Sequence, residues 1–414
     1  MTEAATLPER EQRDRRQDHA AQRPLVRHDA RDITRPTIQW MNFGWVCVAS
    51  ALALSLLGML AIDTTEPQLA IRQAVYLGIG VFSALVVTFP SSTVLRRCSY
   101  PMLIVVIALL VFLLLPGVPE WIVRPRNGAR RWINLYVTDF QPSELAKVAF
   151  VLVLANYLRL RENHRRFLGL IPPFALTFVP MGLILVEPDL GTSLLFLPTL
   201  FAMLIAAGAR IRHFVLIFVL GLALAPSMYP LLKPHQKDRI HAMIGQIAGD
   251  TSRNDNIGFQ GDRAMTLIGA GGLHGVGRDH ARDLIRYNRL PEEHNDMIFA
   301  VIVCRWGLVG GIAVLGLFLL YLVGGVLTAA LCRDPFGRLV VVGLVTMVAA
   351  QMTINIGMTV GLLPITGMTL PFVSYGGSSL VANWLMTGVL LSIALRRPRR
   401  IERHTFEFDD EESH

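Results

Sequence analysis

Ten apolar blocks, most of them about 20 residues long, organise this sequence. A helix needs about 20 predominantly apolar residues to cross the hydrocarbon core of a bilayer. In lipid, every backbone N–H and C=O must be satisfied inside the protein, which such helices achieve. The sequence therefore predicts an all-α, polytopic membrane protein with ten transmembrane helices. The blocks are residues 42–62, 72–90, 101–118, 143–159, 170–187, 190–208, 213–231, 296–328, 339–361 and 377–396.

The loops between the blocks carry most of the positive charge of a chain whose formal net charge is +8. Every second short loop is basic, and Lys and Arg are enriched in cytoplasmic loops. Both termini are therefore predicted to be cytoplasmic, and the long segment 232–295, between predicted helices seven and eight, to be extracytoplasmic. Charge distributed in this way orients a protein in a membrane and requires no nucleic-acid partner. The basic loop residues are Arg96, Arg97, Arg159, Arg161, Arg165, Arg166, Arg210, Arg212, Arg333, Arg338, Arg396, Arg397, Arg399 and Arg400.

Two polar tails flank the predicted membrane domain, 42–396. Residues 1–41 are rich in Arg, Asp, Gln and His and have few large apolar residues, so they are predicted to be a disordered cytoplasmic tail. Residues 397–414 form a second cytoplasmic tail. The first apolar block begins only after about 40 polar residues, which is not the layout of a cleavable signal peptide.

Asp296 lies where the long polar segment ends and an apolar block begins, within Leu290–Ala300. A carboxylate at the mouth of a membrane helix is costly to desolvate, which favours a functional site. The alternative is that Asp296 interacts favourably with the dipole at the helix N-terminus. His294 is a further candidate because it is close to Asp296, whereas the other histidines of this segment have no metal-ligand spacing.

Two further motifs place acidic groups at block ends. Glu144 and Lys147 open the fourth block three residues apart, so they share a helix face and can pair, either around an active cavity or as a purely structural ion pair. Asp189 follows the fifth block in the run Glu187–Thr192. It could cap the next helix, or join Glu187 in binding a divalent cation through oxygen ligands.

Four Arg residues lie in the segment 119–142, on the predicted outer face and against the positive-inside tendency. Such a cluster suggests a phosphate-binding site. An interfacial amphipathic helix anchored by Trp121 and Trp132 is an equally supported alternative, and the two are compatible. The four are Arg124, Arg126, Arg130 and Arg131.

Two segments are rich in helix-breaking residues. The segment 269–277 does not fit a dinucleotide fingerprint, because His274 stands where the third Gly belongs, so no nucleotide cofactor is expected. Its amides could cradle a phosphate, but a flexible turn is favoured. The eighth block is also expected to bend at 305–307. In the segment 361–379, four hydroxyls could bind a sugar or phosphate, or could instead satisfy irregular backbone. They belong to Ser374, Tyr375, Ser378 and Ser379.

Four motifs appear in a fixed order: QPSELAK at 141–147, EPDLGT at 187–192, LPEEHNDMIFAVI at 290–302 and LLPITGMTLPFVSYGGSS at 362–379. With them the chain resembles the SEDS family of RodA, FtsW and SpoVE over residues 42–396, and the last motif looks more like that of RodA than that of FtsW. The resemblance implies the ten-helix SEDS fold and a peptidoglycan glycosyltransferase of the bacterial cytoplasmic membrane. Such an enzyme polymerises lipid II for cell elongation or division, usually with a class B penicillin-binding protein, a transpeptidase.

The resemblance also implies roles for individual residues. Asp296 matches the family's essential aspartate, Glu144 and Lys147 its ion pair, Asp189 the aspartate of its PDLGT motif, and Arg131 the arginine of its Arg-Trp element. Three departures are visible. Glu187 replaces a Gln, Asn295 and Met297 flank Asp296 where Thr and Phe are typical, and Cys304-Arg305 replaces two glutamates.

These expectations combine into one mechanism. Asp296 acts as general base on a sugar hydroxyl of lipid II, which attacks an undecaprenyl-pyrophosphate-linked glycan. Arg131 and Lys147 stabilise the leaving pyrophosphate, with Mg²⁺ or Mn²⁺ near Asp296 or Asp189 as a candidate cofactor and no organic cofactor. Two alternatives remain: a transporter that flips lipid II, and a non-catalytic scaffold for a transpeptidase.

Overall fold

The computed structural model describes residues 42–123, 129–134, 139–160, 167–210 and 256–396, together with four single positions between 212 and 237. All of these residues belong to one unit of the chain, Ile38–Arg397. Both tails, Arg124 and Arg126, nearly all of the predicted seventh span and most of 232–255 lie outside the described residues. The predictions made for those segments therefore stay predictions.

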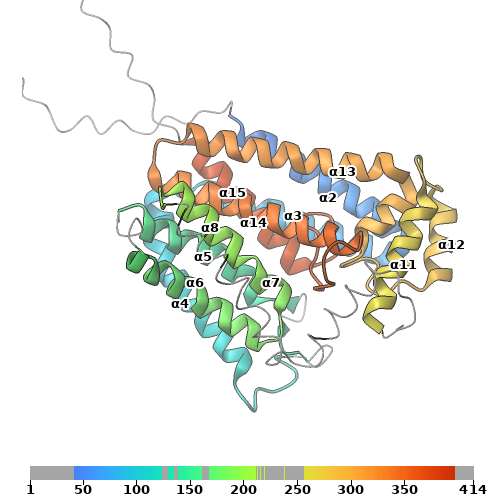
Figure 1. The fold of residues 1–414 in the computed structure, drawn as a ribbon, viewed down its shortest axis with the longest axis horizontal. Coiled ribbons are helices and arrows are strands. Elements are labelled where there is room, and N and C mark those ends of the chain that lie inside the picture. Colours follow the sequence, from blue (N-terminus) through green and yellow to red (C-terminus); the bar gives the residue numbers. More distant parts are fainter. Residues whose placement is uncertain are drawn as a thin grey trace, which may run out of the picture. The chain divides into compact units, whose positions relative to one another are not determined.

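Helices dominate the part of the chain that the structure describes, and seven of them are long and apolar enough to cross a membrane. The predicted all-α, polytopic class is confirmed, whereas the count of ten spans stays a prediction. The helices (Figure 1) are α2 (Gly44–Thr65), α3 (Pro67–Thr88), α4 (Ser92–Leu114), α5 (Pro142–Leu158), α6 (Ile171–Val186), α7 (Leu190–Leu194), α8 (Phe196–Ala206), α11 (Asn256–Gly271), α12 (Arg278–Asn288), α13 (Ile298–Leu331), α14 (Pro335–Thr359) and α15 (Gly377–Leu395), with a 3₁₀ turn η2 (Phe167–Leu170) before α6.

The centre of this helical unit is formed by α5, α14 and α15. Of the apolar window of α15, 78% is buried inside the protein, against 22% for α3 and 28% for α4. Helix α15 packs on α3, α14 contacts α5 and α8, and α2 runs beside the long α13 (Figure 1). The outward faces of α3 and α4 are apolar and exposed, as a lipid-facing surface requires.

A two-stranded antiparallel ribbon leads into α5. Strand β1 (Ile133–Asn134) pairs with β2 (Asp139–Phe140), with Ile133 opposite Phe140 and Asn134 opposite Asp139. Within the described part of 119–142 this ribbon stands where an interfacial amphipathic helix was one of two expectations, and no helix forms there. Strand β2 ends directly before Gln141 and Pro142, so the ribbon delivers the chain to the N-terminus of α5.

Helix α13 is broken at Gly307, where the backbone turns to φ 69° and ψ −164°. The expected bend at 305–307 is confirmed. The glycine-rich segment 269–277 is held against this break by backbone hydrogen bonds, because the amides of Val276 and Gly277 donate to the carbonyls of Cys304 and Arg305 at 3.0 and 3.2 Å. Residues 272–274 form a turn, so this part of the expectation is confirmed, whereas the flexibility of the segment stays a prediction. The amides of Val276 and Gly277 are bonded to α13 and do not face a phosphate.

Candidate active site

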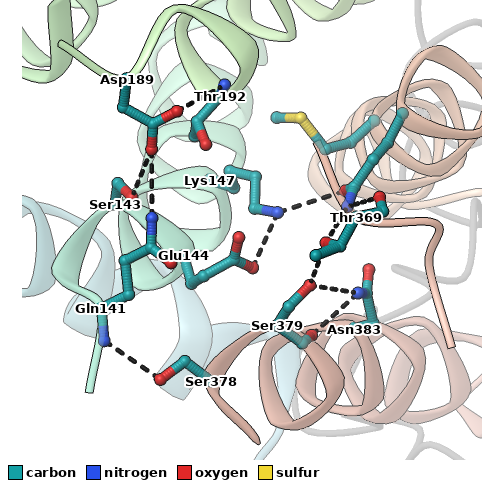
Figure 2. A network of polar contacts seen from close by, with 12 residues as sticks. Gln141, Ser143, Glu144, Lys147, Asp189, Thr192, Thr369, Ser378, Ser379 and Asn383 are labelled. Carbon is teal, nitrogen blue, oxygen red and sulfur yellow. Dashed lines mark hydrogen bonds and ion pairs between the residues drawn. The ribbon is translucent and has the colours of Figure 1, made fainter. Parts of the chain in front are cut away.

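Asp189 caps α7 and joins it to the start of α5 (Figure 2). One carboxylate oxygen accepts from the backbone N–H of Thr192 at 3.1 Å. The other accepts from the amide of Gln141 at 3.1 Å and the hydroxyl of Ser143 at 3.4 Å. The capping role is confirmed, and with 6% of its surface exposed Asp189 uses both oxygens on protein donors.

Glu144 and Lys147 form the expected ion pair, with 2.8 Å between Nζ and Oε2. Both are buried in the first two turns of α5, and Lys147 is only 1% exposed. Lys147 also donates to Oε1 of Gln351 at 3.2 Å, and Gln351 in turn donates to the backbone carbonyl of Thr369 at 2.9 Å. The pair therefore joins α5 to α14 and to the irregular segment before α15 (Figure 2).

Asp296 lies two residues before α13 and is half-buried. The buried side chain of Asn355, on α14, donates to the backbone carbonyl of Asp296 at 2.8 Å and to that of Met368 at 2.5 Å. Gly367 has φ 75°, and a Cβ there would lie 3.4 Å from Oδ2 of Asp296. The carboxylate therefore lies against a backbone turn that has no side chain at its closest point.

The polar residues of α14 connect these two acidic centres. Gln351 holds the ion pair and Asn355, one turn later, holds Asp296. The turn around Gly367 also reaches α7, because a Cβ at Gly191 would lie 3.4 Å from the carbonyl of Thr366. Residues from 141–147, 187–192, 290–297 and 362–379 thus gather at one end of the helical unit, as their motifs predicted.

The three candidate serine hydroxyls of the segment 361–379 are used by the protein itself. The hydroxyl of Ser374 donates to the carbonyl of Asn295 at 2.6 Å, and that of Ser378 donates to the carbonyl of Asp139 at 2.6 Å. Ser379 shares a hydrogen bond with Thr369 at 3.0 Å. The alternative role, satisfying irregular backbone, therefore holds for Ser374, whereas Ser378 bonds the backbone of β2 and Ser379 bonds a side-chain hydroxyl.

Tyr375 and His294 form the aromatic side of the site. The backbone N–H of Tyr375 donates to the carbonyl of His294 at 2.9 Å, and their rings meet edge to face with centroids 5.8 Å apart. Tyr76 of α3 lies 6.2 Å from the ring of Tyr375. Burial lowers the pKa of His294, against the opposing effect of Glu292, so His294 is neutral at pH 7. Flat rings of this kind suit a sugar face.

Part of the Arg131 guanidinium is already hydrogen-bonded within the protein, so only its remaining N–H groups could bind a phosphate. Its Nε donates to the carbonyl of Glu187 at 2.9 Å and its Nη2 to the carbonyl of Pro188, so it fastens the turn between α6 and α7. Glu187 is 2% exposed, and neither carboxylate oxygen has a hydrogen-bond partner among the described residues. Burial, helped by Asp189 and opposed by Arg131, raises the pKa of Glu187 to about 8.

Sequence reasoning missed Gln351, Asn355 and Gln73. Gln73 of α3 donates to the carbonyl of Ser374 at 2.9 Å and is 1% exposed. The available signal was the presence of amide side chains inside apolar blocks, since polar residues in membrane helices tend to face the protein interior. Gln351 and Asn355 are also four residues apart, which places them on one helix face.

Two comparisons with solved structures agree on the fold. A chain from a study of structural coordination of polymerization and crosslinking by a peptidoglycan synthase complex superposes with a TM-score of 0.74 at 32% identity, covering 86% of this chain and 98% of that one. The rod shape determining protein RodA of Thermus thermophilus superposes with a TM-score of 0.63 at 29% identity, covering 87% and 99%.

Sequence comparisons lead to the same group. Stage V sporulation protein E of Bacillus subtilis (strain 168) is 36% identical over 327 residues, covering 78% of this chain and 86% of that protein. The probable peptidoglycan glycosyltransferase FtsW of Pseudomonas fluorescens is 32% identical over 404 residues, covering 92% and 97%. The family model for FtsW, RodA and SpoVE, described as "Cell cycle protein", matches residues 33–398. The chain belongs to this FtsW, RodA and SpoVE family.

Proposed function

We propose that this chain is a peptidoglycan glycosyltransferase that polymerises lipid II, with Asp296 as general base. In the step, Asp296 removes the proton from a sugar hydroxyl of lipid II while that oxygen attacks the anomeric carbon of the growing glycan. The bond from that carbon to undecaprenyl pyrophosphate breaks, and undecaprenyl pyrophosphate leaves. A base of this kind contributes typically about 10²–10⁴ in rate.

The observation that supports this proposal most is the way in which Asp296 is held. Its backbone is clamped by Asn355, and its carboxylate lies against Gly367 at the end of the unit where the other motifs gather. Two residues before Asp296, the ring of His294 meets that of Tyr375 edge to face. A fixed carboxylate suits proton removal from a positioned sugar hydroxyl.

The leaving pyrophosphate needs positive charge. Arg131 spends two of its nitrogens on the carbonyls of Glu187 and Pro188, and Lys147 is buried beside Glu144. We therefore propose that Lys147 contributes positive charge to the site without contacting the substrate. The remaining N–H groups of Arg131 would then bind the phosphates.

A divalent cation near Asp296 is a candidate cofactor of the proposed reaction. Among the described residues no group of three or more His, Cys, Asp or Glu could hold a metal ion, and Asp189 is engaged by protein donors. Mg²⁺ is often held by one or two carboxylates together with substrate phosphates. We propose that such a cation would be held in part by the pyrophosphate of the substrate.

The proposed setting is the cytoplasmic membrane of a bacterium, with both termini cytoplasmic and the site on the outer side. The basic loops support this orientation. A class B penicillin-binding protein is the proposed partner, since the solved relative with the TM-score of 0.74 is part of a peptidoglycan synthase complex in which polymerization and crosslinking are coordinated.

The test is polymerisation of labelled lipid II by the purified protein and by its Asp296→Asn variant, with and without a partner transpeptidase. We expect polymer from the unmodified protein and a loss of about 10²-fold or more in the variant, with unchanged thermal stability. No polymer from either form would support a scaffold, and transport of lipid II without polymer would support a flippase. Near-original polymerisation by Asp296→Asn would move the base role to another acid of the site.

A further inference from the structure

The break in α13 separates a short helical rod from the membrane-crossing part of the helix. The rod, Ile298–Trp306, precedes Gly307, and nine residues of helix span about 13 Å. Residues Ile298 to Cys304 are all buried. Asp296 lies just before one end of this rod and Arg305 lies at the other. A displacement of the Arg305 end is therefore transmitted to Asp296, because a buried helix moves as one body.

The break leaves backbone groups that the rod and the following helix cannot satisfy themselves. The glycine-rich segment supplies the partners: besides the two bonds to Cys304 and Arg305, the amides of Leu308 and Val309 donate to the carbonyls of Gly272 and Leu273 at 2.9 and 3.2 Å. A Cβ at Gly275 would lie 2.2 Å from the carbonyl oxygen of Arg305, so this approach requires glycine.

Arg305 anchors this end of the rod to α2. Its Nη1 donates to the carbonyl of Leu60 at 2.5 Å and to the hydroxyl of Thr64 at 2.7 Å, and its guanidinium lies over the ring of Trp306 at 4.2 Å. The acceptors lie near the C-terminal end of α2, where the helix dipole favours a cation. Thr64 is fully buried, whereas Arg305 is partly exposed, so the contact lies at the edge of the fold.

Helix α12 also contacts the C-terminal end of α2. Arg278 pairs with Asp63 at 2.5 Å, and Arg282 donates to the carbonyls of Thr64 and Asp63 at 2.9 and 3.1 Å. Two arginines of α12 and one of α13 thus meet the C-terminal end of α2, where Asp63 pairs with Arg278. The positive charge of Arg305 therefore has its partners within this chain.

We infer that Arg305 is a positioning residue for Asp296: it fixes the far end of the rod on α2 and so holds the carboxylate at its working place. This inference rests on the proposed base role of Asp296. Arg305 touches no reacting atom, and its effect is exerted through the rod. A misplacement of a reacting group by about 1 Å can cost about 10²-fold in rate.

The experiment uses the full-length protein in lipid II polymerisation, comparing kcat and KM. Arg305→Ala is expected to lower kcat at least tenfold with KM within about threefold, because substrate contacts stay while the base shifts. Arg305→Lys, which keeps the cation, is expected to recover part of kcat. Arg333→Ala, on the exposed loop before α14, removes an Arg of equal charge and is expected to leave kcat unchanged.

If Arg305→Ala folds poorly, the inference can still be tested with a milder variant and with a double-mutant cycle. Thr64→Val removes one acceptor of Arg305 at nearly equal volume and is expected to lower kcat several-fold. Arg305→Ala added to Asp296→Asn is expected to cause no further loss. Unchanged kcat in folded Arg305→Ala, or losses that multiply in the double variant, would overturn positioning through Asp296. Full activity of Asp296→Asn alone would overturn the base role itself.

Discussion

The side-chain amide of Asn355 donates to the backbone carbonyl of Asp296 at 2.8 Å, from a helix 59 positions further along the chain. The same group donates to the carbonyl of Met368, so one buried amide holds both the candidate base and the turn that faces it. Asn355 is fully buried, which makes these two carbonyls dependent on it.

Asn355→Leu is expected to destabilise the protein by about 1–3 kcal/mol, because a buried polar group left without a partner costs that much. Lipid II polymerisation should fall in parallel, since Asp296 loses its clamp. Thermal unfolding and polymerisation measure the two effects. Thr359→Val, which removes only a bond back to the carbonyl of Asn355, is the control and should change little. Equal behaviour of the two variants would contradict the clamp.

Lys147→Ala is expected to cost about 3–5 kcal/mol, because it leaves the buried carboxylate of Glu144 uncompensated. The double variant Glu144→Ala with Lys147→Ala should be less damaged than the sum of the single changes. The free energies are compared from denaturation of the four proteins in one detergent. Strict additivity would show that the 2.8 Å contact carries no coupling.

Glu187 should make the free energy of unfolding decrease as pH rises from about 4.5 to about 8. Its pKa is raised from 4.5 to about 8 in the folded protein, so the folded state holds this proton more tightly than the unfolded chain. The resulting stability is present below pH 4.5 and is lost as pH rises through about 8. Glu187→Gln keeps a donor and an acceptor but does not titrate. Melting temperatures between pH 5 and 9 should fall less in this variant, and parallel curves would contradict the assignment.

Gly275→Ala is expected to open the junction between the glycine-rich segment and α13, since the added Cβ would lie 2.2 Å from the carbonyl oxygen of Arg305. Both stability and polymerisation should decrease. Gly316→Ala is the matched control, because a Cβ there meets nothing within 4 Å and alanine favours a helix. Hydrogen exchange of 271–277 reports the junction directly, and unchanged protection in Gly275→Ala would count against it.

The orientation can be checked by cysteine labelling in a background without Cys98 and Cys332. Tyr287→Cys, at a position 90% exposed on α12, should react with an impermeant maleimide in spheroplasts. Arg333→Cys, in a loop predicted to be cytoplasmic, should react only after the membrane is opened. The reverse pattern would invert the proposed topology.

The sequence predicted the helical class, the ion pair, the cap at Asp189 and the bend near Gly307, because each depends on local spacing or on one conformational preference. It offered backbone satisfaction as one role of the serine hydroxyls but did not predict their partners, because only the tertiary fold brings Asn295 near Ser374 and Asp139 near Ser378. The contact of residues 269–277 with α13 could not be predicted either. It consists of backbone hydrogen bonds, and the only trace of it in the sequence is the glycines.

Helix α14 sets a distance within the site. Gln351 meets Lys147 and Asn355 meets the carbonyl of Asp296, and four residues of helix advance by about 6 Å. One inserted residue between these amides would turn the second by about 100° and aim it away from Asp296. The spacing of four residues between Gln351 and Asn355 must therefore be kept, whereas the side chains between them can vary.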